Sequence, residues 1–155
     1  MVVLLALGWY LSYTAVRLDR LHTRLEATGS ALEAQVVRRA QTAIEVAYTG
    51  DLDPASGALL IDAARTCLDY EGPWVPDRCA AESNLTVLMH LALPQPPAEL
   101  EEMAMRLRLA RRFHNEAVAQ TQAVHSRRAV RTFRLAGHTA APEPVEFDDG
   151  WPPPI

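Results

Sequence analysis

The sequence predicts an all-α protein, on the strength of three observations. Apolar residues recur at steps of three and four in two long stretches, as they do on the inward face of a helix. No window shows the strict alternation of apolar and polar residues that is typical of a half-buried strand. Glycine and proline interrupt the helical pattern at 49–54, 71–77 and 94–97. We therefore expect an N-terminal transmembrane helix that continues into an antiparallel bundle of three to four long helices.

Residues 1–16, MVVLLALGWYLSYTAV, contain no charged side chain and are predicted to form a membrane anchor. A helix of this length spans roughly 24 Å, slightly less than the hydrocarbon layer of about 30 Å, and Arg17 can extend the span by snorkelling. A cleaved signal peptide is disfavoured, because the segment lacks a basic start and a small-x-small cleavage site. A buried core helix is the alternative. The apolar segment is followed by three arginines, Arg17, Arg20 and Arg24, and by one acid among them, Asp19. Because an excess of positive charge marks the cytoplasmic flank of a span, we expect a single-pass protein of the cell membrane with its bulk in the cytoplasm.

Residues 17–137 are predicted to form the helical bundle. The first helix continues outward and should end near Gly50, because glycine often follows the last helical residue. Asp53 followed by Pro54 is an N-cap with proline at the first helical position, and it begins a short second helix. The inward stripe of the first helix consists of Leu18, Leu21, Leu25, Leu32, Val36, Ala40, Ile44 and Ala47.

A third helix is predicted at 77–92 and a fourth, longer one at 98–135, with Gly137 as its stop. Residues 138–155 form a proline-rich acidic tail that we expect to be extended or disordered, with Phe147 and Trp151 able to dock it. The inward stripe of the fourth helix is predicted to be Leu100, Met103, Leu107, Ala110, His114, Ala117, Thr121 and Val124, widened by Leu109, Phe113 and Val118.

Composition and spacing argue against several classes of function. A net charge of -4 and a pI near 5.7 provide no cationic field for a phosphate backbone, so nucleic acid is not an expected partner. Cys67 and Cys79 show neither a C-x-x-C spacing nor a neighbouring His/Cys cluster, so no zinc site is predicted. The chain has no Gly-x-Ser-x-Gly turn and no glycine-rich phosphate loop. We therefore expect no enzyme activity and no cofactor.

His114 lies in the richest polar stretch of the fourth helix, but its spacing does not predict a metal site. Two metal ligands on one helix must be three or four residues apart. The residues at these distances from His114 include Arg111 and Val118, and neither is a metal ligand. His125 follows on nearly the same face, but about 16 Å along the axis. A core histidine that sets register in the bundle is the favoured interpretation, and a pH switch is an alternative.

Two segments resemble the bacterial LemA family: YLSYTAVRLDRLHTRLEATGSALEAQVVRRA after the apolar start, and ARRFHNEAVAQTQAV in the fourth helix. The resemblance extends from about Tyr10 to Phe147 and is to a divergent member of actinobacterial type. The family's Ile-Pro-Asn-Leu after the first arginine pair is absent here. The resemblance implies a membrane-anchored long-helix bundle and brings no catalytic residue. The residues that match the signature are Ala110, Arg111, Arg112, Phe113, His114, Asn115, Ala117 and Val118.

The sequence thus favours an interaction or scaffold protein at the inner membrane. Such a protein would present polar helix faces or its tail to protein partners of unknown identity, or would self-associate. The tail segment EPVEFDDGWPPPI, an aromatic flanked by acids and a polyproline run, is of the extended type that docks in grooves. The alternative is a membrane-tethered sensor that binds a small molecule or a metal in the bundle. An enzyme or metal site would have to use His22, His90, His114 or His125 with scattered acids.

Overall fold

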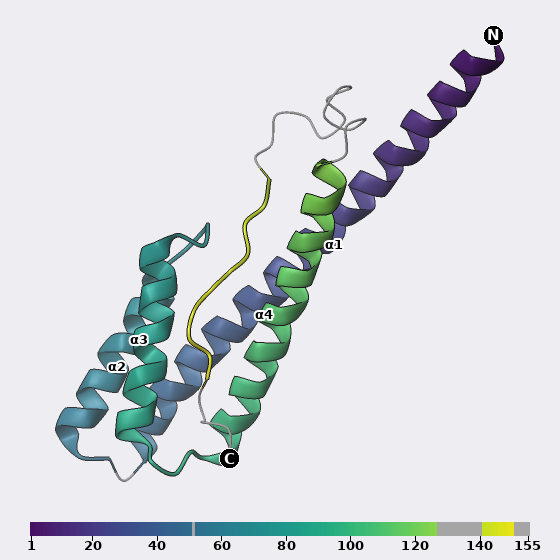
Figure 1. Cartoon of the computed structure of the whole chain (residues 1–155). Helices are drawn as coiled ribbons and strands as arrows, with labels where there is room; N and C mark the ends of the chain where they lie inside the picture. Colours follow the sequence, from purple (N-terminus) through teal and green to yellow (C-terminus); the bar gives the residue numbers. More distant parts are fainter. Residues whose placement is uncertain (51, 127–140, 151–155) are drawn as a thin grey trace. The chain divides into compact units, whose positions relative to one another are not determined.

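The computed structural model describes residues 1–50, 52–126 and 141–150, and it confirms that this part of the chain is all-α. Four helices follow one another, α1 (Val2–Thr49), α2 (Pro54–Asp69), α3 (Pro76–Ala92) and α4 (Ala98–His125) (Figure 1). The predicted end of the last helix at Gly137 lies outside the described residues. The chain divides into two compact units, and both α1 and α4 contribute to each of them.

The helix ends follow from local sequence. At Gly50 a Cβ would lie 2.6 Å from the carbonyl oxygen of Val46, so only glycine fits without a backbone shift at the end of α1. Asp53 caps α2 as predicted, because its Oδ1 accepts from the backbone N–H groups of Ala55 (3.0 Å) and Ser56 (3.1 Å). Hydrogen bonding by Ser56, through its side chain first and then its backbone N–H, lowers the pKa of the Asp53 carboxyl. Gly72 adopts a φ of 88° in the α2–α3 turn, where a side chain would be strained.

The larger unit, residues 31–112 with 145–150, is a four-helix unit. In Figure 1 α2 and α3 lie side by side. Ala40 and Ala43 of α1 share a cluster with Leu100 and Ala104 of α4, while Leu32 and Val36 share another with Leu107. The two helices are therefore antiparallel within this unit. The larger cluster is completed from α2, α3 and the residue after α3 by Leu60, Ala63, Ala64, Cys67, Leu85, Met89 and Leu93.

The smaller unit, residues 1–30 with 113–126 and 141–144, is a two-helix unit. Leu18 and Leu21 of α1 pack with Val124 of α4, and Arg24 donates a 3.0 Å hydrogen bond to Gln120. Here too the two helices are antiparallel, because later residues of α1 meet earlier residues of α4.

Large apolar side chains at the start of α1 are exposed. These are Met1, Val2, Leu5, Trp9, Tyr10, Tyr13 and Val16. In the part of the chain that the structure describes, we find no helix with a segment long and apolar enough to cross a bilayer. The membrane anchor at residues 1–16 stays a prediction.

The predicted inward stripes are mostly correct, with one error on α4. The stripe from Leu100 to Val124 is buried or partly buried throughout. Leu109 and Phe113, predicted to widen it, are exposed, whereas Val118 is buried. The physical reason is that α4 packs against its neighbours over a narrow sector of its circumference. Positions next to the stripe are therefore exposed on one side of it and buried on the other. Together with Met105, the two exposed residues are spaced four apart and share one face of α4.

Candidate functional site

The site with the most organised polar contacts is formed by residues 145–150, which we call the C-terminal strap, on the surface of the four-helix unit. The strap has no helical or strand hydrogen bonding and runs in an extended conformation. Val145 and Phe147 are buried while Glu146 and Asp148 are exposed, as expected when alternate side chains of an extended chain point to opposite sides. The strap therefore turns its apolar side chains inward, while Glu146 and Asp148 lie on its outer side.

Phe147 is the anchor of the strap, with 8% of its surface exposed. Its ring stacks on Trp74 with centroids 5.6 Å apart and an interplanar angle of 17°. The guanidinium carbons of Arg39 and Arg111 lie 5.8 and 5.6 Å from the centroid of the ring. Offset stacking and cation–π attraction each add to the burial of the ring. The pocket that holds Phe147 thus combines an aromatic wall with two cations.

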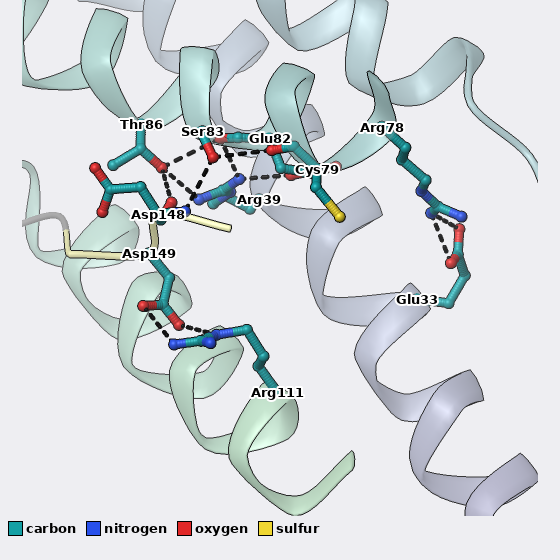
Figure 2. Close-up of polar contacts among 10 residues, drawn as sticks. All are labelled: Glu33, Arg39, Arg78, Cys79, Glu82, Ser83, Thr86, Arg111, Asp148 and Asp149. Atoms are coloured by element: carbon teal, nitrogen blue, oxygen red, sulfur yellow. Dashed lines mark hydrogen bonds and ion pairs between the residues drawn. The ribbon is translucent and has the colours of Figure 1, made fainter. Parts of the chain in front are cut away.

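Two hydroxyl groups of α3 bind the backbone of the strap (Figure 2). The N–H of Asp148 donates to Ser83 Oγ at 3.0 Å, and Thr86 Oγ1 donates to the carbonyl oxygen of Asp148 at 2.6 Å. Ser83 and Thr86 are three residues apart and so share a face of α3. These bonds satisfy both backbone polar groups of one strap residue, which is how a groove holds an extended peptide independently of its side chains.

Arg111 of α4 binds two acidic side chains of the strap, and Figure 2 shows its pairing with Asp149. Its Nε and Nη2 donate to the two carboxylate oxygens of Asp149 at 2.7 and 3.1 Å, and its Nη1 donates to Glu146 at 3.2 Å. The hydrogen bonding to Asp149 is the main cause that raises the pKa of Arg111. A bidentate arginine–carboxylate pair fixes direction as well as distance. Arg111 therefore sets the register of the strap.

A buried ion pair supports the Thr86 hydroxyl group. Arg39 of α1 and Glu82 of α3 have 2% and 1% of their side chains exposed, and Arg39 Nη2 lies 2.5 Å from Glu82 Oε2. Arg39 Nη1 also donates to Thr86 Oγ1 at 3.0 Å. This leaves the hydroxyl hydrogen of Thr86 free to point at its acceptors, among them the carbonyl oxygen of Asp148. The pair therefore orients Thr86 toward the strap.

A second buried arginine holds the aromatic wall. Arg78 Nη2 donates to both carboxylate oxygens of Glu33 at 2.6 and 2.7 Å, and its Nη1 donates to the carbonyl oxygen of Gly72 at 2.7 Å. The guanidinium carbon lies 4.0 Å from the centroid of the Trp74 ring. Trp74 lies in the α2–α3 connection, and these contacts tie that connection to α1 and α3. Its ring is thereby fixed in the position where it meets Phe147.

The predicted signature residues do not form one site. Ala110 and Arg111 contribute to the strap site, while Arg112 and Phe113 are exposed and Asn115 is partly buried. His114, Ala117 and Val118 are buried in the two-helix unit. There the His114 ring carbon Cε1 lies 3.6 Å from where a Cβ on Gly29 would stand, and its Nδ1 has no hydrogen-bond partner among the described residues. Burial lowers the pKa of His114.

Sequence reasoning missed most of the strap site. It did not single out Arg39, Arg78, Glu82, Ser83 or Thr86. A signal was nevertheless present, because 78, 82, 85 and 89 step by four, three and four along the third helix. Two ionisable residues on that inward stripe require buried partners, but a single sequence does not say which residues these are.

The described residues offer little for nucleophilic or metal chemistry. No three His, Cys, Asp or Glu side chains among them are close enough to share an ion. Both cysteines are free thiols. Burial raises the pKa of Cys67 to about 12 and also raises the pKa of Cys79, which disfavours the reactive thiolate. The side chain of His125 lies outside the described residues. What the arrangement can do is hold an extended acidic peptide.

Comparison of the chain with models of known protein families, with curated proteins and with solved structures gives no match. The resemblance to the LemA family therefore stays a prediction from the motif residues.

Proposed function

We propose that the chain is a membrane-anchored helical-bundle protein that acts as an interaction or scaffold module at the inner membrane. The observation that carries the proposal is the exposure of the apolar side chains in residues 1–16. Leu5 and Trp9 are 70% and 74% exposed. Exposed large apolar side chains gathered in one segment are characteristic of a surface that contacts lipid or another protein. The arginines at 17, 20 and 24 support contact with anionic lipid on the cytoplasmic side.

The interaction role rests on the strap site. Its groove holds an extended segment through an aromatic anchor, backbone hydrogen bonds and a bidentate arginine, the combination by which grooves recognise peptides. The exposed face of α4 with Met105, Leu109 and Phe113 is a second apolar surface available for association.

The anchor is tested with a matched pair of substitutions in the full-length chain. Leu5→Arg places a charge in the predicted span, and Leu91→Arg places the same charge on α3 at a position of similar exposure, 75%. The chain is expressed in bacterial cells with a C-terminal tag, and isolated membranes are washed with alkaline carbonate. We expect wild type and Leu91→Arg to stay with the membranes and Leu5→Arg to be released at least several-fold more. Release of all three chains alike would contradict the anchor.

The scaffold role is tested by crosslinking the tagged wild-type chain in intact cells before extraction with detergent. A recurrent protein joined in near-equal amount is the expected result. Recovery of uncrosslinked chain alone, at full expression, would contradict a scaffold.

A further inference from the structure

We infer that the groove on the four-helix unit also accepts the strap of a second copy of this chain, so that two chains associate by exchanging straps. This inference deepens the proposed interaction role and rests on it, but it does not depend on the membrane anchor. Its basis is the chemistry of the groove and the way in which the strap is connected.

The groove is complete without the strap. Among the residues that the structure describes, the polar and aromatic groups seen to bind the strap come from residues 31–112: Arg39, Trp74, Ser83, Thr86 and Arg111. The supporting ion pairs, Arg39 with Glu82 and Arg78 with Glu33, also lie within residues 31–112. The groove is therefore composed of residues outside the strap, and any segment of the same chemistry meets the same contacts.

The contacts are selective for one kind of segment. The strap has the sequence VEFDDG, in which an aromatic residue is flanked by three acids. Arg111 pairs with two of these acids, and the stacked ring of Phe147 requires an aromatic at the centre. A second copy of the strap satisfies every one of these contacts, and for this reason it is the occupant we propose.

The connection between α4 and the strap is long in sequence. Residues 126–144 separate the end of α4 from Val145, and a chain of nineteen residues can span up to about 60 Å. Among the described residues, exchange would also break the 2.7 Å hydrogen bond from Gln122 Nε2 to the carbonyl oxygen of Pro142 in the two-helix unit. Exchange of an identical element between copies is a low-cost route to association, because each interaction broken within a chain re-forms between the two chains. The strap of the same chain competes with the strap of a second copy for the groove, so exchange is best measured with variants that cannot close their own sites.

Two complementary variants of the full-length chain test the inference. Phe147→Ala damages the strap and leaves the groove intact, whereas Arg111→Glu damages the groove by charge reversal and leaves the strap intact. Neither chain can close its own site, but the strap of the Arg111→Glu chain fits the groove of the Phe147→Ala chain. The two are labelled with a fluorescent donor and acceptor, mixed at micromolar concentration in a mild detergent, and followed by energy transfer and by light scattering.

We expect heterodimer in the mixture at a level at least tenfold above either variant alone. The control is the double variant Phe147→Ala/Arg111→Glu mixed with each single variant, since these mixtures contain no intact strap and groove in different chains. An excess of the synthetic peptide EPVEFDDG should dissociate the heterodimer, and the same peptide with alanine for phenylalanine should not. If Phe147→Ala lowers the helix content, Asp149→Ala serves as the damaged strap instead.

Energy transfer equal to that of the controls, with both variants folded by circular dichroism, would overturn the inference. The energy-transfer measurement is made with purified chains in detergent, so its failure would say nothing about the membrane anchor. Release of the wild-type chain from membranes by carbonate would contradict the anchor alone.

Discussion

The two units are built on the same two helices, yet they differ in what those helices bury. In the four-helix unit the stripe of α1 from Leu32 to Ala43 packs against α2, α3 and α4 and is almost fully buried. In the two-helix unit the described buried residues include the polar side chains of Thr14, His114 and Thr121 beside few apolar ones. The comparison shows that the three- and four-residue period sets which face turns inward, whereas the number of neighbouring helices sets how large an apolar cluster that face joins.

The largest expected effect comes from breaking the buried ion pair of the four-helix unit. Glu82→Ala leaves the guanidinium of Arg39 buried without its carboxylate, which should cost about 3–5 kcal/mol of unfolding free energy. Since domains of this size are stable by about 5–15 kcal/mol, the midpoint of urea denaturation, followed by circular dichroism, should fall strongly.

Exposed carboxylates provide the matched controls for Glu82. Glu102 pairs with Arg106 on the surface of α4, with 57% and 48% of their side chains exposed. Glu102→Ala should cost no more than roughly 0.5 kcal/mol. A urea midpoint for Glu82→Ala close to that of Glu102→Ala would show that the Arg39–Glu82 pair does not contribute as its burial indicates.

A smaller effect is expected from truncating one leucine in each unit. Leu60→Ala in α2 removes a fully buried side chain from the larger cluster, and we expect a cost toward the upper end of about 2–5 kcal/mol. Leu18→Ala should lie toward the lower end of the same range, because the small cluster around it can collapse onto the space. Urea denaturation measures both, and native-state hydrogen exchange locates the loss. The contrast between the units would be contradicted if both substitutions cost the same unfolding free energy and if the loss of hydrogen-exchange protection spread equally along α1.

The sequence predicted the all-α bundle of the described residues but not the site. The cap at Asp53, the end of α1 at Gly50 and the α4 stripe are local patterns whose physical causes act within a few residues, and all three are observed. The strap site joins Arg39, Ser83, Arg111 and Asp149, which are far apart in the chain. No local rule relates such residues, so only the packed structure shows that they meet.

The smallest expected effect is a pH dependence confined to the two-helix unit. Burial lowers the pKa of His114 below its ordinary value of 6.5. The folded chain therefore binds this proton less readily than the unfolded chain, and stability should fall as the pH drops below about 6.5 and level off below the folded pKa. His114→Gln should flatten this part of the curve, as measured by thermal midpoints between pH 7.5 and 5. An unchanged curve in the variant would show that His114 does not titrate differently on folding.

The stack of Trp74 on Phe147 has a practical consequence. An indole held against a phenyl ring and an arginine side chain has an environment that changes when the strap leaves. The chain has three tryptophans, of which Trp9 is exposed at the start of α1. With Trp9 and Trp151 replaced by phenylalanine, the emission of Trp74 becomes an intrinsic optical probe of strap occupancy. It would show, without any added label, when the groove opens and when it is filled again.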